Sequence, residues 1–234
     1  MRAADSEGDH EEGDLVHPVA TGARRFDSSS ISPLTVNRLS LYLRSLRQLE
    51  EQGVRRISSQ QLASRFHLSS TQIRKDLAQF GEFGVRGVGY DVRGLADHLA
   101  ALLQLDRTHR LLIVGMGNVG TALARFPPFN SGSFSVVAGF DSDPTKVGRR
   151  IGSVLVHAMK ELEQVTAATG AEMAILAVPV ATAPEAYRRL ADAGVSAVLN
   201  FAPVLLPSRP GCRVKNIDLR IPLEELAFFV ASGL

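Results

Sequence analysis

Apolar residues in the first third of the chain recur at the spacing of α-helices. Pro33 can begin a helix and Gly53 can end it, and six leucines between them have near-helical spacing: Leu34, Leu39, Leu41, Leu43, Leu46 and Leu49. Two shorter segments, 60–66 and 70–80, each follow serines that can cap a helix. The pattern predicts one long helix and then two short helices joined by a brief turn.

A short helix, a turn and a second helix with a polar first turn are typical of a helix-turn-helix, whose second helix enters the major groove of DNA. Residues 81–90 follow it with four glycines and alternate like a tight hairpin, as a wing does. We therefore expect a winged helix-turn-helix domain with Arg86 at the wing tip. The residues expected to face DNA are Ser70, Thr71, Gln72, Arg74, Lys75, Arg86 and Gly87.

The pattern changes after a leucine-rich helix expected at 95–105. Strands are predicted at 110–115, 135–141, 172–178, 195–201 and 213–218, with helices between them at 118–126, 159–169 and 182–193. The strands are continuous apolar runs, which is typical of a parallel sheet covered by helices on both faces. We expect an α/β, Rossmann-like domain that binds its ligand outside the carboxyl ends of the strands.

A glycine motif directly follows the first of these strands. Residues 111–120 read LLIVGMGNVG, so the strand runs into the spacing G-x-G-x-x-G of dinucleotide-binding turns. In that turn Gly115 permits the tight bend, Gly117 lets a pyrophosphate approach the backbone, and Gly120 lets helix and strand pack closely. We expect Asn118 and Val119, which lie between these glycines, to contact the cofactor as well.

An acidic residue ends the second strand, 26 positions after the first glycine of the motif. Asp141 is near the position where a carboxylate accepts hydrogen bonds from an adenosine ribose, which favours NAD over NADP. Three nearby bases, Lys146, Arg149 and Arg150, leave NADP open, and we place Lys146 in the cofactor site. A turn or helix-capping role is the alternative for Asp141.

Charge is distributed unevenly along the chain. Residues 32–90 contain nine basic and four acidic residues, whereas residues 1–31 contain three basic and seven acidic ones. A basic domain beside a near-neutral one is typical of a nucleic-acid binder with a sensory module. The acidic segment 1–31 has too few large apolar residues to fold, so we expect a disordered tail, either solvated or competing with DNA for the basic surface.

Several protein classes are excluded. Cys212 is the single cysteine, so an internal disulfide framework and a cysteine-rich zinc site are ruled out. No run of about 20 apolar residues and no leader pattern is found, so we expect a cytoplasmic protein that does not enter membranes.

The sequence also argues against an enzyme. His98 and His109 precede the sheet, His157 is expected in a connection, and no base with an orienting partner is found at the later strand ends. Those ends carry groups suited to packing a nicotinamide ring: Val178, Pro179, Asn200 and Phe201. The domain is therefore expected to bind a dinucleotide without reacting it.

In this order the motifs resemble the Rex family of bacterial redox-sensing transcriptional repressors, over residues 32–231. The resemblance rests on residues 73–77 (IRKDL), 80–81 (FG), 86–90 (RGVGY), 114–120 (VGMGNVG), 140–148 (FDSDPTKVG) and 200–203 (NFAP). It implies a homodimer that binds a palindromic DNA operator when NADH is scarce. It further implies that a rise of NADH relative to NAD+ causes NADH to bind and the repressor to leave DNA.

The resemblance also implies a C-terminal helix, about 222–231, that is swapped between the subunits. Phe228 in this helix matches an aromatic near the partner's nicotinamide, and Arg44 and Tyr90 match positions that help couple the nicotinamide site to the DNA-binding domains. Tyr90 is therefore also expected in the cofactor site. Packing of the helix on its own domain is the alternative that the apolar pattern leaves open. The expected organisation is a tail at 1–31, a winged helix at 32–93, a Rossmann domain at 94–221 and the swapped helix at 222–234.

One rival function comes from the same glycine turn, because related sheets bind coenzyme A or other adenine nucleotides. Coenzyme A carries a 3′-phosphate close to where the Asp141 carboxylate is expected. That like-charge contact favours NADH and NAD+ as the cofactors.

Overall fold

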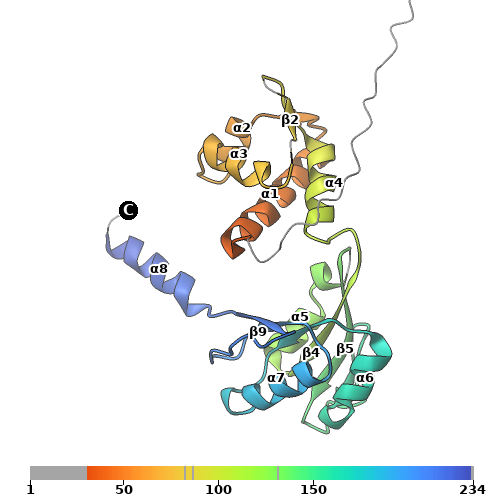
Figure 1. Cartoon of the computed structure of the whole chain (residues 1–234). Coiled ribbons are helices and arrows are strands. Elements are labelled where there is room, and N and C mark those ends of the chain that lie inside the picture. The colour runs from red at the N-terminus through yellow and green to blue at the C-terminus, as the bar shows by residue number, and fades with distance from the viewer. Residues whose placement is uncertain (1–30, 82, 86, 131, 233–234) are drawn as a thin grey trace, which may run out of the picture. The chain divides into compact units, whose positions relative to one another are not determined.

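The computed structural model describes residues 31–81, 83–85, 87–130 and 132–232, so the predicted acidic tail lies almost wholly outside the described residues, as does Arg86. The chain divides into two compact units, one ending at Ala96 and one beginning at Asp97. Figure 1 shows the helices and strands of both units. Each unit is described by itself.

The first unit contains three helices, a small sheet and the start of a fourth helix. The order is α1 (Pro33–Glu51), β1 (Arg56–Ile57), α2 (Ser59–Ser64), α3 (Ser70–Ala78), β2 (Gly84–Val85), β3 (Gly89–Asp91) and α4 (Val92–Leu102). The strands pair antiparallel in the order β1-β3-β2. This arrangement confirms the winged helix, and it adds β1, which is too short for its pattern to be recognised in the sequence.

Serine caps explain where these helices begin. Ser32 Oγ accepts a hydrogen bond from the Leu34 N–H, with Pro33 in the first turn. Ser58 forms a capping box with Gln61, in which each side chain bonds the other residue's N–H, and Ser69 caps α3. A side-chain oxygen at this position satisfies an N–H group that the helix itself leaves unpaired, so the local sequence fixes each start.

The second unit contains a seven-stranded sheet with strand order β10-β9-β8-β4-β5-β7-β6. All neighbours pair in parallel except β6, which is antiparallel to β7. The strands are β4 (His109–Val114), β5 (Phe134–Asp141), β6 (Arg150–Ile151), β7 (Val154–Ala158), β8 (Met173–Leu176), β9 (Ala197–Asn200) and β10 (Arg213–Asn216). The predicted Rossmann-like sheet is confirmed.

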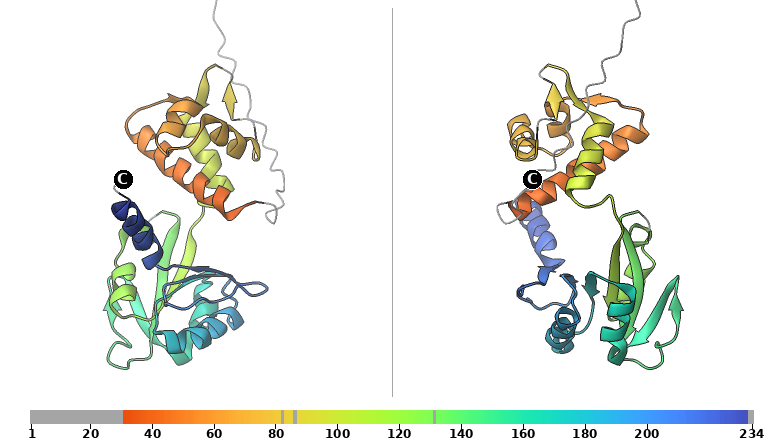
Figure 2. Two further views of the ribbon diagram at one scale, coloured as in Figure 1. Left: turned by 90° about the vertical axis from the view of Figure 1, so that its left-hand side faces the viewer. Right: turned by 45° about the vertical axis from the view of Figure 1, so that its right-hand side comes forward.

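Helices cover both faces of this sheet (Figures 1 and 2). Leu112 and Val114 of β4 share a core with α6 (Leu162–Thr169) and α7 (Ala183–Asp192), whereas Leu111 and Ile113 of the same strand share a core with α5 (Asn118–Ala124). Successive side chains of a strand point to opposite faces, so a strand buried on both faces needs the continuous apolar run seen here.

The hairpin of β6 and β7 was not predicted. His157 was expected in a connection, but it lies in β7, which pairs with β5, and its ring is 5.8 Å from that of Phe140. The apolar run of β7 is short and follows a glycine and a serine, so the sequence signal for a strand is weak.

The last helix is α8 (Arg220–Ala231), and none of its residues is buried. Its side chains nevertheless include large apolar groups, among them Phe228 at 67% exposure. Across the described part of the chain, helices with the length and apolar character of a membrane span are absent.

Candidate functional sites

The glycine turn connects β4 to α5, and its three glycines have different surroundings. Gly115 has φ +94°, and a Cβ at this position would collide with the Ala177 carbonyl oxygen. A Cβ at Gly120 would collide with the Gly115 carbonyl oxygen. Both positions therefore require glycine for backbone packing, as the sequence predicts.

Gly117 lies next to open space. A Cβ at this position would have no heavy atom within 4 Å, and Gly117, Asn118 and Val119 are all exposed. The backbone here has the free approach that a pyrophosphate needs. The residues present thus fit a dinucleotide, and contact by Asn118 and Val119 stays a prediction.

Asp141 lies at the carboxyl end of β5 and is tied to the glycine turn. Its Oδ2 accepts hydrogen bonds from the Met116 N–H and from Lys146 Nζ, both at 2.9 Å, and its Oδ1 accepts one from the Asp143 N–H at 2.8 Å. Burial raises the pKa of Asp141, but the hydrogen bonds from Asp143, Lys146 and Met116 outweigh it, and the net shift is downward. Asp141 is therefore an anion at neutral pH.

These contacts bear on both roles considered for Asp141. The bond from Asp143 two residues on is a turn contact, so the turn role is present. A carboxylate has about four acceptor positions, and three are in use, which leaves about one for a ribose hydroxyl. Ribose binding by Asp141 and cofactor contact by Lys146 stay predictions.

The loops after β8 and β9 supply the apolar residues of the expected nicotinamide side. Val178 is half-buried, and its Cγ1 lies 2.9 Å from the position that a Cβ on Gly115 would take, so it adjoins the glycine turn. Pro179 is exposed and Phe201 is half-buried. These three residues can contact a ligand, which stays a prediction for each.

Asn200 is fully buried and bonded within the protein. Its Nδ2 donates to the carbonyl oxygens of Ala202 and Val204 and to Oδ1 of Asn216, and its Oδ1 accepts from the Ala202 N–H. Asn216 in turn bonds both backbone groups of Leu206. Asn200 thus shapes the loop after β9, and its expected contact with a ligand stays a prediction.

On the DNA-binding unit, α3 presents Thr71, Arg74 and Lys75 to solvent. Arg74 Nη2 donates to Thr71 Oγ1 at 3.2 Å, which orders the exposed face. Ser70 and Gln72 are half-buried, and Gly87 is exposed at the wing turn with φ +82°. An exposed positive face is thus present on α3, and its contact with DNA stays a prediction, while Arg86 at the predicted wing tip lies outside the described residues.

The sequence did not reveal the charged residue that holds α3 in place. Asp76 is 0% exposed, and its carboxylate accepts hydrogen bonds from Arg38, Tyr42 and Gln72 at 2.6–2.8 Å. Burial raises the pKa of Asp76, but these hydrogen bonds outweigh it and the net shift is downward. A signal does exist, because Asp76 falls on the inward face with Ile73 and Leu77.

Tyr90 was expected in the cofactor site, and it lies in β3 of the first unit. Arg44 is exposed on α1, and Phe228 is exposed on α8 of the second unit. Contact of Tyr90 and Phe228 with a nicotinamide stays a prediction, as does the coupling role of Arg44.

Comparison with known proteins agrees with both units. Residues 30–78 match a protein family described as a putative DNA-binding protein N-terminus, and residues 106–204 match one described as a CoA binding domain. A relative from Carboxydothermus hydrogenoformans named redox-sensing transcriptional repressor Rex is 42% identical over 198 residues, which cover 85% of this chain and 95% of the relative. A protein of the same name from Chloroflexus aggregans is 39% identical over 198 residues, covering 85% and 93%.

Solved structures show the same relationship. RSP in complex with β-NAD+ and operator DNA has a TM-score of 0.82 to this chain at 32% identity, covering 87% of this chain and 94% of RSP. RSP in complex with β-NADH has a TM-score of 0.80 at 31% identity, covering 87% and 96%. With such identity over most of both chains, this protein belongs to the Rex family of redox-sensing transcriptional repressors.

Proposed function

We propose that this chain is a repressor, not an enzyme, that binds operator DNA through its winged helix and leaves DNA when NADH occupies its Rossmann-like unit. Its relatives carry the name redox-sensing transcriptional repressor, and RSP has been solved with NAD+ and operator DNA together and with NADH. The single observation that carries the proposal is the open space at Gly117 beside the buried Asp141 carboxylate. A dinucleotide fits there because its pyrophosphate can reach the backbone while its ribose meets an acceptor.

Discrimination between the two cofactor forms belongs to the nicotinamide end. A ligand shifts DNA affinity only by binding the free and DNA-bound arrangements differently. NAD+ and NADH share the adenosine and the pyrophosphate, so Gly117 and Asp141 supply affinity common to both. They differ in ring charge and planarity, which apolar residues such as Val178 and Phe201 can sense.

Homodimerisation through α8 is part of the proposal. Seven large apolar side chains between Leu219 and Val230 are exposed: Leu219, Ile221, Leu223, Leu226, Phe228, Phe229 and Val230. So much exposed apolar surface is typical of an interaction site. A second copy of the chain covers it in our proposal, with Phe228 beside the partner's nicotinamide, and a palindromic operator matches the two-fold symmetry of such a dimer. We place the protein in the cytoplasm, where the NADH pool and the DNA are.

Coenzyme A is the second candidate ligand, because the matching domain family is described as a CoA binding domain. Asp141 disfavours it, since the carboxylate would face the 3′-phosphate of coenzyme A. Other adenine nucleotides are candidate ligands on the same grounds as coenzyme A.

One titration tests the proposal. Fluorescence anisotropy of the full chain on a labelled palindromic duplex is measured with NADH, with NAD+, with coenzyme A and with no addition. We expect tight binding that NADH reverses at concentrations where NAD+ and coenzyme A have little effect. Tight DNA binding that is indifferent to both NADH and NAD+ would refute redox sensing and leave the winged helix intact.

A further inference from the structure

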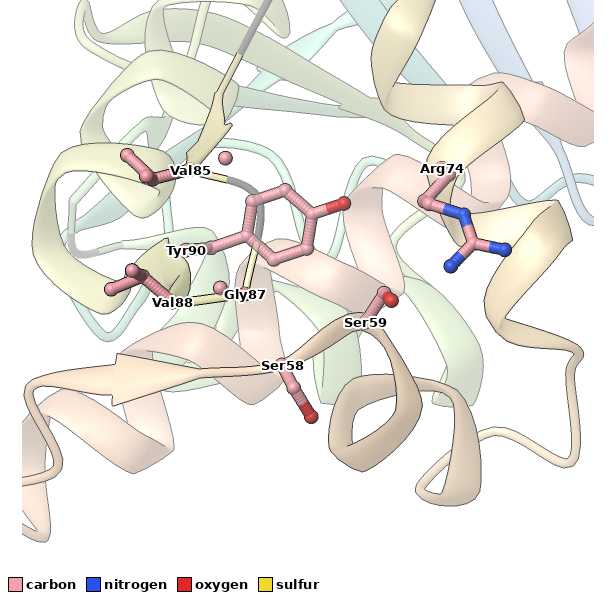
Figure 3. A pocket seen from close by; sticks show the side chains of 9 residues that line it. Ser58, Ser59, Arg74, Val85, Gly87, Val88 and Tyr90 are labelled. Atoms are coloured by element: carbon pink, nitrogen blue, oxygen red, sulfur yellow. The ribbon is translucent and has the colours of Figure 1, made fainter.

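A cavity of about 410 Å³ lies within the DNA-binding unit, between the recognition helix α3 and the wing (Figure 3). The first unit alone forms it. Its side-chain lining comes from α3, from the junction of β1 with α2 and from the wing, and includes Ser58, Ser59, Arg74, Val85, Val88 and Tyr90.

Tyr90 is held rigidly at one side of this cavity. The residue is 7% exposed, and its ring packs on Gly84, where a Cβ would lie 2.9 Å from Tyr90 Cε1. Gly84 faces Tyr90 across the β2–β3 pair, and Ile57 of β1 faces it on the other side. The ring therefore packs closely against Gly84, where a Cβ would force it to shift.

The hydroxyl of Tyr90 points toward Arg74 across the cavity (Figure 3). It forms no hydrogen bond with any residue that the structure describes, although the side chain is more than nine-tenths buried. Burial raises the pKa of Tyr90, and the positive charge of Arg74 only partly opposes the shift. The hydroxyl is thus a protonated donor at neutral pH that opens onto the cavity and has no acceptor among the described residues.

The other polar side chains that line the cavity can also donate hydrogen bonds. Arg74 gives one nitrogen to Thr71 Oγ1 and has further N–H donors to offer, and its guanidinium points toward the same space as the Tyr90 hydroxyl (Figure 3). Ser59 contributes a hydroxyl, and none of the described residues that line the cavity is acidic. A positive charge with neutral donors around it selects an anion with several acceptor oxygens, as a phosphate has.

We propose that this cavity binds one phosphodiester group of the operator, with the Tyr90 hydroxyl and the Arg74 guanidinium donating to its non-bridging oxygens. The inference rests on the proposed function and names a specific part of its DNA interface. DNA lying on the exposed face of α3 brings its backbone to the cavity, since Arg74 belongs to both. Tyr90 then contacts the DNA backbone directly, in place of the cofactor role that the family resemblance implies.

The first test compares variants of the full chain on a labelled operator duplex. Tyr90→Phe removes only the hydroxyl, and we expect about tenfold weaker binding because a hydrogen bond to a charged acceptor is lost. The dependence of affinity on salt stays the same for this variant, whereas Arg74→Ala also lowers the salt slope by about one. Val88 lines the same cavity and carries no donor. Val88→Ala is therefore the matched control, and we expect its affinity for the operator to be unchanged.

A methylphosphonate scan identifies the phosphate. Each backbone position of one half-site is made neutral in turn, and we expect one position at which the wild-type chain loses affinity and Tyr90→Phe loses nothing further. If the loss of affinity from Tyr90→Phe added to the loss from the neutral phosphate at every position, the proposal would be overturned. Since the hydroxyl is unpaired in the free protein, the thermal midpoint of Tyr90→Phe should equal that of the wild type.

The same titrations separate this inference from the proposed function. If Tyr90→Phe binds the operator as the wild type does but no longer responds to NADH, Tyr90 belongs to nicotinamide sensing and the phosphate site is wrong. If the wild type binds no palindromic duplex, the proposed function fails and the phosphate site fails with it.

Discussion

Arg38 on α1 donates two hydrogen bonds to Asp76 on α3, from Nε to Oδ2 at 2.6 Å and from Nη2 to Oδ1 at 2.8 Å. Tyr42 and Gln72 donate to the remaining acceptor positions at 2.8 Å. The recognition helix is therefore held to the longest helix of its unit by a fully hydrogen-bonded carboxylate. The position of the exposed face of α3 depends on this pair.

Removing the cation of this pair should destabilise the protein. Arg38→Ala leaves a buried carboxylate without its charge partner, and we expect the free energy of unfolding to fall by about 2–4 kcal/mol. Urea denaturation followed by circular dichroism measures the change. Arg188→Ala is the control, because Arg188 pairs with Glu185 and Asp192 at the surface, where such pairs contribute about 0–1 kcal/mol. Equal effects of the two variants would contradict the assigned role of Arg38.

The Asp76 carboxylate also predicts that the stability of the protein depends on pH. The pKa of Asp76 is lowered in the folded protein, so the unfolded chain binds more protons as the pH falls through its ordinary value of about 4. The stabilisation that Asp76 provides is present above that pH. It is lost below it, as the pH falls toward the pKa that Asp76 has in the folded protein. We expect Asp76→Asn to be less stable at neutral pH and to lose less stability on acidification. Urea midpoints measured from pH 7 down to pH 3 test this, and parallel curves for the two proteins would refute it.

The glycine turn predicts different outcomes at two neighbouring positions. Gly117→Ala places its Cβ in open space with φ −76°, so stability should change by less than about 1 kcal/mol while both NADH and NAD+ bind more weakly, because the methyl group blocks the pyrophosphate. Gly120→Ala drives a Cβ into the Gly115 carbonyl and should cost about 1–3 kcal/mol of folding free energy. Urea denaturation and calorimetric nucleotide titration of both variants check the contrast. Unchanged nucleotide affinity in Gly117→Ala would show that the pyrophosphate lies elsewhere.

Asp141→Ala should weaken NADH and NAD+ alike, by about tenfold or more, because the ribose is common to both and the lost contact involves a charged acceptor. Calorimetric titration with each nucleotide gives the two affinities. Asp143→Ala is the control, since the side chain of Asp143 bonds to Thr145 and lies outside the predicted ribose contact. Loss of discrimination with unchanged affinity for one nucleotide would show that Asp141 acts at the nicotinamide end.

The sequence predicted well those features that depend on neighbouring residues. Serine caps, the glycine turn and the apolar runs of the sheet are local signals, and the winged helix and the parallel sheet follow from them. The β6–β7 hairpin was not predicted because its strands are only two and five residues long. Such short strands depend more on pairing with a neighbour, as β7 pairs with β5, than on their own sequence pattern.

Contacts between distant residues could not be predicted in the same way. Asp76 and Arg38 are 38 positions apart, and an aspartate on a predicted recognition helix looks like a solvated charge until α1 is placed against it. Similarly, the position of Asn200 at a strand end gives no sign that its amide bonds to Asn216, 16 residues later. Which residues become hydrogen-bond partners over such sequence distances depends on the packing of the whole unit.

The Asp141 carboxylate bonds the Met116 N–H inside the glycine turn and the Lys146 ammonium as well as the Asp143 backbone. An engineer who wished to convert the protein to a phosphorylated ribose would ordinarily begin by replacing this one acid. Here that replacement also removes the acceptor of the Met116 N–H, and among the described residues it leaves the Lys146 ammonium with only its 4.0 Å contact to Asp143. A change of the acid at position 141 thus also changes the support of the glycine turn, and a redesign has to supply a new acceptor for the Met116 N–H and a new partner for Lys146.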